Sequence, residues 1–500
     1  MMSERSPDIV YIHPAKQRVG FSFGDPRLSY LTPFTMMPVG VIGLLNLLPA
    51  EGLSVRGVNY PAEGFIDPTF DLRAWLAQVA PPRLYLIDLH WYEHSFGALD
   101  VAAACKQISP STPVAIGGMT ASLFAHEILG SFPQVDFVIV GDAEEPLRLL
   151  ANHCCGGDSR VNLSSIPNLA YRVDGQVLAN ECLYTASPAD LDALDFASLD
   201  WLEHPRRYGG YQYVGRREQF VPSEEPRYLA HWLSIGRGCV HHCSFCGGSY
   251  ESHEVIAKRQ GLVMRSVDRV VDEMEALYER GIHQIALTLD PAVVGEDYWR
   301  ALFDEMSRRQ LRLGIYNEAF QLPSEDFCVA FAECADLEHS QLALSPLSGD
   351  ERVRHLNGKA FSNHELFERL KTLRKLKVPL AIYYSFNLPG QNEASLRRTL
   401  FVSQRIGRLY PARHLIMYNQ PHTLDPCSPM SRRPEDFDID VLLHSFQDYY
   451  DYCRRTAIEN PGVQGIRDCG FRWRGRTREE ERRMQALWLG FSRQQRFLCF

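Results

Sequence analysis

The sequence predicts an α/β protein in which a Rossmann-like, doubly wound parallel sheet is followed by a partial (β/α)6 barrel and a small, mainly helical C-terminal cap. The first observation is that residues 1–152 alternate five short apolar runs with amphipathic stretches. The second is that six further apolar runs within residues 229–420 alternate with helical patterns. We therefore expect two α/β domains whose loops gather at the carboxyl ends of the strands.

The composition is that of a soluble globular protein. The chain has 500 residues, of which 45% are hydrophobic and 23% charged, and its formal net charge is -9. This acidic balance disfavours a nucleic-acid partner. No stretch approaches 18 uninterrupted apolar residues, and residues 1–6 contain no apolar signal core, so we expect no membrane partner and a cytoplasmic location. The 13 cysteines are mostly scattered singly and do not resemble a secreted disulfide framework.

The first domain is expected to span residues 1–152. Its predicted strands cover residues 8–13, 54–60, 83–89, 113–118 and 136–141. The fourth and fifth of these strands end in turn residues, at Gly117-Gly118 and at Gly141. A glycine pair lets the backbone come close to a bound group, although such a pair after a strand is more often only a turn.

The remaining chain divides into a connector over residues 153–228, a barrel over residues 229–420 and a cap over residues 421–500. We expect the connector to carry a hairpin of residues 168–172 and 176–179 and to run across the domain interface. The predicted barrel strands cover residues 232–236, 284–289, 311–316, 341–344, 380–386 and 414–418. The aromatic residues of the last segment are expected to form a helical cap over the open barrel mouth, where aromatics at helical spacing are usually core.

Three thiols at Cys239, Cys243 and Cys246 follow the first barrel strand and precede Gly247-Gly248. Three thiolates can bind three irons of a four-iron four-sulfur cluster and leave the fourth iron open for chemistry. Zinc is the alternative, but no second CxxC or HxxxH partner follows at zinc-finger spacing. Chance spacing is the remaining possibility.

This CxxxCxxC stretch resembles the signature of the radical S-adenosylmethionine (SAM) enzymes. The resemblance implies a 4Fe-4S cluster, SAM as cosubstrate, cleavage to a 5′-deoxyadenosyl radical, and an external one-electron reductant such as flavodoxin or ferredoxin. By position it also implies SAM contacts at Phe245, Gly247, Asp290, Ser345, Ser348 and Pro389. The chain departs from the family pattern where Leu347 replaces a common Glu or Gln and where Leu289-Asp290-Pro291 replaces Gly-Gly-Glu.

The N-terminal loops resemble those of the cobalamin-binding domain that precedes many radical enzymes. The residues that carry this resemblance, and that it implies as cobalamin contacts, are Gly117, Gly118, Thr120, Ala121, Gly141 and Glu144. The usual DxHxxG motif is absent, since that position reads Ile12-His13-Pro14, so we expect no histidine from that motif on cobalt. His90 and Tyr92 follow the third strand and are expected beside the corrin, with Tyr92 also a catalytic candidate; the loop can equally be ordinary surface. A Rossmann-like domain with another ligand, or with none, remains the alternative.

Together the two resemblances imply a class B radical SAM methyltransferase that methylates an unactivated carbon of a small-molecule, natural-product intermediate. In the family's usual scheme one SAM methylates cobalt(I), while a second yields the radical that activates the substrate. A cobalamin-dependent rearrangement or oxidative cyclisation is an alternative, as is a radical enzyme whose N-terminal domain is only a sensor or docking module. Cys427, in a proline-framed loop past the sixth strand, is a further catalytic candidate or simply a small buried residue.

Overall fold

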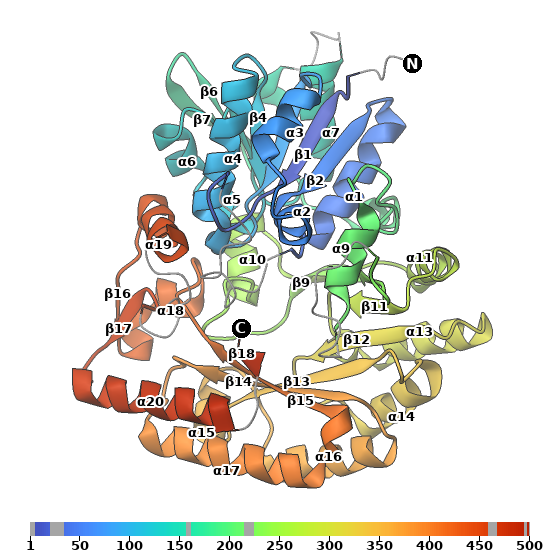
Figure 1. Cartoon of the computed structure of the whole chain (residues 1–500), viewed down its shortest axis with the longest axis vertical. Helices are drawn as coiled ribbons and strands as arrows, with labels where there is room; N and C mark the ends of the chain where they lie inside the picture. Colours follow the sequence, from blue (N-terminus) through green and yellow to red (C-terminus); the bar gives the residue numbers. More distant parts are fainter. Residues whose placement is uncertain are drawn as a thin grey trace.

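The computed structural model describes residues 6–20, 35–156, 162–214, 225–458, 468–494 and 498–499. In this part of the chain, two seven-stranded sheets form the two halves of the molecule (Figure 1). The first half, at the top of the view, is built from the N-terminal residues, and the second is the barrel below it. None of the helices in these ranges is long and apolar enough to span a membrane.

Five parallel strands form the main part of the first sheet, as predicted. They are β1 (Ile9–His13), β2 (Val55–Asn59), β3 (Leu84–Asp88), β4 (Val114–Gly117) and β5 (Phe137–Ile139), in the order β2-β1-β3-β4-β5. Every residue of β1 and of β3 is buried. Strands buried on both faces read as continuous apolar runs, which is why these runs could be found in the sequence.

Helices cover both faces of this sheet. Residues of α3, α4 and α6 share one apolar core with β1 and β3, whereas α1 and α7 belong to a second core on the other side. The helical elements are α1 (Val39–Leu47), η2 (Leu48–Glu51), α2 (Tyr60–Ile66), α3 (Leu72–Gln78), η3 (Tyr92–His94), α4 (Ser95–Ile108), α5 (Met119–Leu123), α6 (Ala125–Ser131) and α7 (Glu144–Cys155). The doubly wound arrangement is therefore confirmed.

The predicted hairpin exists, and it belongs to the first sheet. The connector residues after it pack in both halves, with Leu191 in the barrel core and Trp201 in a core of the first domain. Its strands β6 (Leu169–Val173) and β7 (Gln176–Ala179) extend the sheet antiparallel to β5. Pairing with β5 covers an edge that would otherwise expose unpaired backbone groups. Three short helical elements complete the segment up to the barrel: η4 (Leu163–Ser165), α8 (Pro188–Asp192) and α9 (Pro205–Gln212).

The second sheet contains six parallel strands in sequential order, which confirms the partial barrel. They are β8 (Ala230–Leu233), β11 (Gln284–Leu287), β12 (Gly314–Ala319), β13 (Gln341–Leu347), β14 (Leu380–Phe386) and β15 (Leu415–Pro421). The third strand begins later than predicted, because the apolar residues Leu311 and Leu313 precede it as core residues while polar Glu318 lies within it. The helical elements that connect the six barrel strands are α11 (Val267–Glu279), α12 (Pro291–Val294), α13 (Glu296–Arg308), α14 (Glu325–Cys334), α15 (Glu351–Leu356), α16 (Asn363–Lys375), α17 (Glu393–Leu409) and η6 (Ala412–His414).

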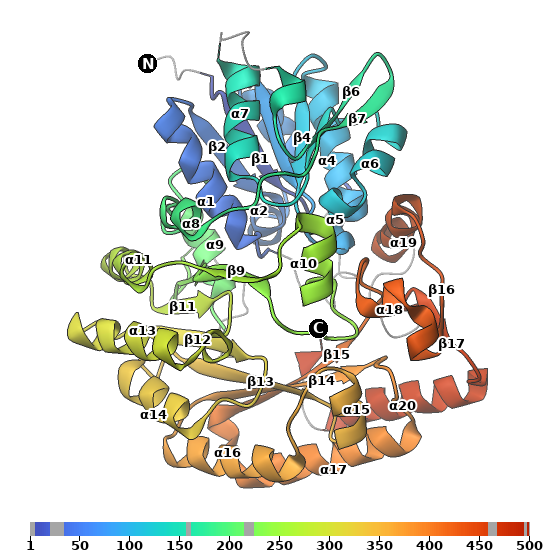
Figure 2. The ribbon, with the colours of Figure 1, turned by 180° about the vertical axis from the view of Figure 1, so that it is seen from behind.

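A small unit that the sequence did not predict lies between the first barrel strand and α11. The strands β9 (Gly236–Cys239) and β10 (Gly261–Met264) pair antiparallel, and α10 (Tyr250–Ala257) lies between them in sequence. Gly238 has φ +104°, and a Cβ there would lie 2.1 Å from the carbonyl oxygen of Gly261. Only glycine fits this position. The unit lies between the two halves in both views (Figures 1 and 2).

The C-terminal residues do not form one cap over the barrel mouth. Helix α19 (Phe446–Ile458) packs on the first domain through Phe446 and Tyr449, which contact Phe124 and other aromatic residues there. Helix α20 (Arg478–Gln494) lies beside α17 on the outside of the barrel (Figures 1 and 2). The other elements are α18 (Pro429–Arg432), η7 (Pro434–Phe437), β16 (Ile439–Val441), β17 (Phe471–Trp473) and β18 (Leu498–Cys499), which extends the barrel sheet at β15. The aromatic residues are thus core, as their helical spacing allowed.

Candidate functional site

A cavity of about 410 Å³ lies where the carboxyl end of the first sheet faces the barrel. The first domain lines it with His90, Trp91, Gly117, Gly118 and Gly141, together with residues 36–41. The barrel and its inserted unit complete the wall with Trp232, Ser234, Arg237, His253 and Thr288. The two domains therefore share one site, at the strand ends where α/β folds bind ligands.

Three glycines shape the wall of this cavity. A Cβ on Gly117 would meet nothing within 4 Å, whereas one on Gly118 would lie 2.7 Å from the backbone of His90. Gly118 and Gly141 have φ of +115° and +73°, and a Cβ on Gly141 would lie 3.1 Å from Cα of Ala257. A side chain at Gly117 would thus enter the open space, and Gly118 and Gly141 allow close contacts between backbones.

Three of the predicted cobalamin contacts do not line the cavity. Thr120 donates its hydroxyl to the carbonyl oxygen of His90 at 2.9 Å, and Ala121 is completely buried in the core. The carboxylate of Glu144 is 2.5 Å from the guanidinium of Arg237. These side chains support the cavity loops from behind, because α5 and α7 turn them away from the open space.

Tyr92 also lies away from the cavity, contrary to the prediction. It is 2% exposed, and its ring packs against Tyr449 and Tyr452 of α19. Its hydroxyl hydrogen-bonds with that of Thr423. Burial raises the pKa of Tyr92 well above its ordinary value, with smaller contributions from Glu93 and other neighbours. The residue is a docking contact for α19, which the polar aromatic loop in the sequence did not reveal.

His90 lines the cavity, and its predicted place beside the corrin stays a prediction. Burial lowers the pKa of its imidazole to about 4 against the opposing effect of Asp88. The ring is therefore neutral near pH 7. Its neighbour Trp91 also faces the cavity and packs against the His90 ring, with the ring centroids 4.7 Å apart.

A charged cluster joins the two domains at the edge of the cavity. Arg237 contacts Asp142 at 2.7 Å and also binds Glu144, while Arg259 forms a second ion pair with Asp142. Burial alone would raise the pKa of Asp142, but the two guanidinium groups hold it below its ordinary value. This ion-pair cluster fixes the cysteine-bearing unit against the first domain, and it was not predicted from the sequence.

The three cysteines Cys239, Cys243 and Cys246 are half-buried on the loop that begins at the end of β9. The N–H groups of His241 and Gly248 approach the sulfurs of Cys239 and Cys246, at 3.3 Å in both cases. Hydrogen bonds of this kind to sulfur adjust the reduction potential of a bound cluster.

Two buried features lie directly beside this loop. A Cβ on Gly358 would be 3.3 Å from Cα and 3.5 Å from Sγ of Cys243, so the chain passes very close to the thiol. Lys359 is 3% exposed and donates to the carbonyl oxygen of Phe320 at 2.6 Å. Burial lowers the pKa of Lys359, and the thiols of Cys243 and Cys246 oppose this effect. A buried cation here would favour thiolates over thiols.

The segment after the sixth barrel strand holds the cysteine loop in place. The N–H of Gly247 donates to Oδ2 of Asp425 at 2.9 Å, and the hydroxyl of Ser252 donates to the carbonyl oxygen of Cys427 at 2.9 Å. Burial raises the pKa of Asp425, and the nearby charge of Glu93 adds to this. Sequence reasoning missed Asp425, although it directly precedes the Pro426-Cys427 pair that was singled out.

Cys427 contributes its backbone to this contact. Its φ is +63°, an uncommon value for a residue other than glycine. The side chain is 5% exposed, and burial raises the pKa of the thiol. The geometry therefore supports the structural interpretation of Cys427 more directly than the catalytic one.

Among the predicted SAM contacts, Asp290 and Ser348 already have partners within the protein. Asp290 is the N-cap of α12 and accepts from the N–H of Ala292 and of Phe320, each at 3.0 Å. Ser348 is completely buried and accepts from the N–H of Asp350 at 3.1 Å. Both side chains stabilise loops, and their contact with SAM stays a prediction.

Among the other predicted SAM contacts, Phe245 and Gly247 belong to the cysteine loop itself. The ring of Phe245 stacks on His422 with the centroids 4.2 Å apart and packs against the apolar cluster formed by Leu347, Val353 and Leu388. Pro389 follows Leu388 and accepts from the side chain of Asn357 at 3.0 Å. Ser345 is half-buried on β13. Direct contact of these residues with SAM stays a prediction.

A partial barrel with three cysteines on the loop after its first strand, opening to a cavity shared with a doubly wound domain, is the arrangement of a cofactor-dependent enzyme. Residues 233–402 match the model of the radical SAM superfamily. The chain therefore contains a radical SAM domain, and a 4Fe-4S cluster and SAM are the cofactors of this barrel.

Two solved structures share the fold over most of the chain. The radical SAM methyltransferase TsrM from Kitasatospora setae, with cobalamin and a 4Fe-4S cluster bound, has a TM-score of 0.58 at 16% identity, covering 85% of this chain and 77% of TsrM. The cobalamin-dependent SAM radical enzyme OxsB has a TM-score of 0.55 at 14% identity, covering 80% of this chain and 52% of OxsB. The fold is thus that of cobalamin-dependent radical SAM enzymes.

The curated relatives with similar sequences carry the names of other enzymes than the two solved structures do. The tRNA-2-methylthio-N(6)-dimethylallyladenosine synthase of Vesicomyosocius okutanii subsp. Calyptogena okutanii is 24% identical over 239 residues, which are 44% of this chain and 50% of that protein. The anaerobic magnesium-protoporphyrin IX monomethyl ester cyclase of Synechocystis is 24% identical over 139 residues, 28% of this chain and 23% of the cyclase. The chain thus spans half or less of the length of these relatives.

Proposed function

We propose that the protein is a cobalamin-dependent radical SAM methyltransferase that methylates an unactivated carbon of a small-molecule intermediate. One observation carries this proposal: the carboxyl ends of the first sheet and of the barrel strands β8 and β11 line the same cavity, and residues of β9 and α10, which flank the cysteine loop, line it too. Two cofactors bound at these strand ends would face one another. The likeness to TsrM and OxsB, whose structures contain cobalamin, supports the choice of the second cofactor.

The residues of the barrel fit a cluster with three protein ligands. The three thiols share one loop, two backbone N–H groups already point at the sulfurs, and the buried amino group of Lys359 lies nearby. A fully ligated structural zinc site would need a fourth protein ligand. The open iron left by three cysteines is the position where SAM would bind in this proposal.

The cavity of the first domain fits the corrin and tail of cobalamin. Gly117 and Gly118 provide a wall without side chains, and apolar residues such as Leu86, Ile87 and Ile116 line the same space. His90 offers a neutral imidazole at this wall. The proposal places the ligand between the first sheet and Trp232 of the barrel.

When bound, the cluster and SAM supply a 5′-deoxyadenosyl radical, and cobalamin supplies the methyl group. The chain itself positions these groups and excludes water. The ion pairs of Arg237 with Asp142 and Glu144 hold the two halves together. Within the barrel, Glu318 accepts a hydrogen bond from Tyr316 at 2.5 Å, and burial raises the pKa of this carboxyl. Sequence reasoning missed this buried carboxyl.

A small molecule fits this site better than tRNA. The net charge of the chain is -9, whereas tRNA binding is favoured by a basic surface. The curated relatives that modify tRNA match only about half of their own length. An external one-electron donor of the flavodoxin or ferredoxin type completes the proposed system.

The proposal is tested with SAM that carries a deuterated methyl group. The anaerobically reconstituted protein, with cobalamin and a reductant, is incubated with a small-molecule extract of the host cells. We expect a product that gains one deuterated methyl group, together with 5′-deoxyadenosine and S-adenosylhomocysteine. Formation of 5′-deoxyadenosine with a product that gains no label would instead indicate rearrangement or cyclisation.

A further inference from the structure

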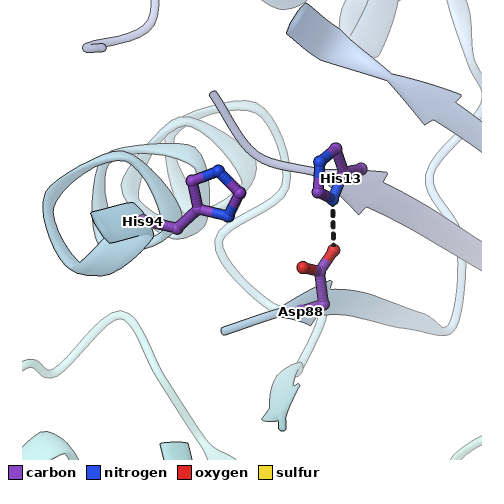
Figure 3. A group of neighbouring side chains, drawn as sticks. All are labelled: His13, Asp88 and His94. Atoms are coloured by element: carbon purple, nitrogen blue, oxygen red, sulfur yellow. Dashed lines mark hydrogen bonds and ion pairs between the residues drawn. The ribbon is translucent and has the colours of Figure 1, made fainter. Parts of the chain in front are cut away.

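We propose that His13, Asp88 and His94 bind one divalent transition-metal ion, zinc in the first instance, at a buried site of the N-terminal domain (Figure 3). One ligand atom from each of the three side chains lies within 4.8 Å of the others. The three ligands lie outside the cysteine loop, and the metal proposal does not depend on the proposed enzymatic function.

The fold brings the three side chains together from separate segments. His13 is the last residue of β1 and Asp88 the last residue of β3, and these parallel strands pair through Ile12 and Ile87 immediately before them. His94 ends η3, directly before α4. Because the two strand ends are register neighbours, the side chains of His13 and Asp88 meet at the carboxyl edge of the sheet.

The geometry of the group is compact and fully enclosed. Nδ1 of His13 lies 2.9 Å from Oδ1 of Asp88, and the two imidazole rings have centroids 5.2 Å apart at an angle of 78°. The residues are 0%, 3% and 0% exposed for His13, Asp88 and His94, respectively. In Figure 3 the ring of His94 extends from its helix toward the other two side chains.

A carboxylate oxygen of Asp88 is the second feature that indicates a bound cation. Its Oδ1 accepts from the hydroxyl of Tyr11 at 2.6 Å, but its Oδ2 is buried and has no hydrogen-bond partner among the described residues. A buried carboxylate oxygen without a donor is costly. A cation bound between Asp88 and the two imidazoles would compensate this oxygen.

The donor set indicates the kind of ion. Two imidazoles and one carboxylate suit zinc and its neighbours in the first transition series, whereas calcium and magnesium prefer oxygen ligands alone. Binding through Nδ1 of His13 requires that this nitrogen carry no proton. The neutral imidazole would then carry its proton on Nε2, and the ion would take the place of the proton between His13 and Asp88.

With three protein ligands, a tetrahedral ion would keep one coordination position for a water molecule or another ligand. Its role would be to hold together the segments that carry the three ligands. It would connect the ends of β1 and β3 to the start of α4, which lies behind the cavity wall that Asp88 helps to form. His13 and His94 do not line that cavity. An ion that binds only the folded chain raises its thermal stability.

The test uses the full chain with its iron-sulfur cluster reconstituted, so that iron occupies the cysteines. Zinc is added, excess is removed by desalting, and iron and zinc are counted separately by mass spectrometry. We expect about one zinc per chain and a higher Tm in the native protein. Asp88→Asn and His94→Gln should each weaken zinc binding about tenfold or more, whereas His126→Gln, on an exposed histidine of α6, should not.

Pulsed EPR of the copper-loaded protein provides a second measurement. Two imidazole nitrogens should couple to Cu²⁺ in the native chain, and one of them should be lost in His94→Gln. Circular dichroism checks that each variant is folded, and the zinc count of the folded variants decides. Native protein without zinc, or equal zinc in the native chain and in Asp88→Asn, would overturn the proposal and leave a buried polar group with a His13–Asp88 hydrogen bond and no ion.

Discussion

Asp290 is a buried carboxyl whose pKa makes stability depend on pH. Burial raises this pKa from 3.8 to about 6, although the N–H groups of Phe320 and Ala292 oppose the shift. The folded chain therefore binds a proton at Asp290 more tightly than the unfolded chain does. This contribution is fully present below about pH 4 and is lost as the pH rises through about 6.

Asp290→Asn should remove this dependence. We expect the stability difference between variant and native protein to move in favour of the variant as the pH rises from about 4 to about 6.5. Urea unfolding at a series of pH values measures it. Two stability curves that stay parallel over this range would show that Asp290 does not titrate as described.

Variants of Cys427 and Ser252 distinguish the backbone contact of Cys427 from a chemical role of its thiol. The carbonyl oxygen of Cys427 accepts a hydrogen bond from the Ser252 hydroxyl at 2.9 Å. Cys427→Ala should therefore keep the iron content and the ratio of 5′-deoxyadenosine to product. Ser252→Ala should destabilise the cysteine loop by about 1 kcal/mol and lower the retained iron. Uncoupled 5′-deoxyadenosine formation in Cys427→Ala would instead assign the thiol a chemical role.

At the scale of elements, the ion-pair cluster of Arg237, Asp142 and Glu144 connects β9 to the loop after β5. Arg237→Ala leaves two buried carboxylates without this partner, so we expect a loss of about 3–5 kcal/mol in unfolding free energy. Urea unfolding measures the loss. The matched control is Arg397→Ala, which removes an exposed pair with Glu393 and should cost less than about 1 kcal/mol. Equal effects of the two changes would contradict the assigned role.

The elements that sequence predicted well are those with a local signal. The strand Leu380–Phe386 agrees residue for residue, because both of its faces are largely buried and its run is apolar. The antiparallel unit of β9 and β10 was missed because it depends on the close approach of Gly238 to Gly261. The place of α19 was missed for a similar reason: a helical aromatic stripe indicates burial but does not name the surface that covers it.

At the scale of the whole molecule, the functional site also combines residues that could be predicted from the sequence with residues that could not. The three cysteines and Gly117-Gly118 could be read from their spacing and from their place at strand ends. The partners that support them could not. Asp425 lies 178 residues from Gly247 in sequence, and only the fold brings the two into contact at 2.9 Å. Tyr92 was expected beside the corrin because the sequence does not show on which side of η3 it lies.

The central claim is that one chain holds two cofactors at one cavity, and separate loss of each cofactor tests it most directly. Anaerobic reconstitution is followed by iron and sulfide counting and by the optical spectrum of retained cobalamin. The native chain should retain about four irons and one cobalamin.

The triple alanine variant of Cys239, Cys243 and Cys246 should lose the iron and keep the cobalamin. Gly117→Leu, which fills the cavity, should do the reverse, while Gly130→Leu, at an exposed position of α6, should lose neither. Native protein that retains no cobalamin, or that retains as much of it as Gly117→Leu does, would contradict the account.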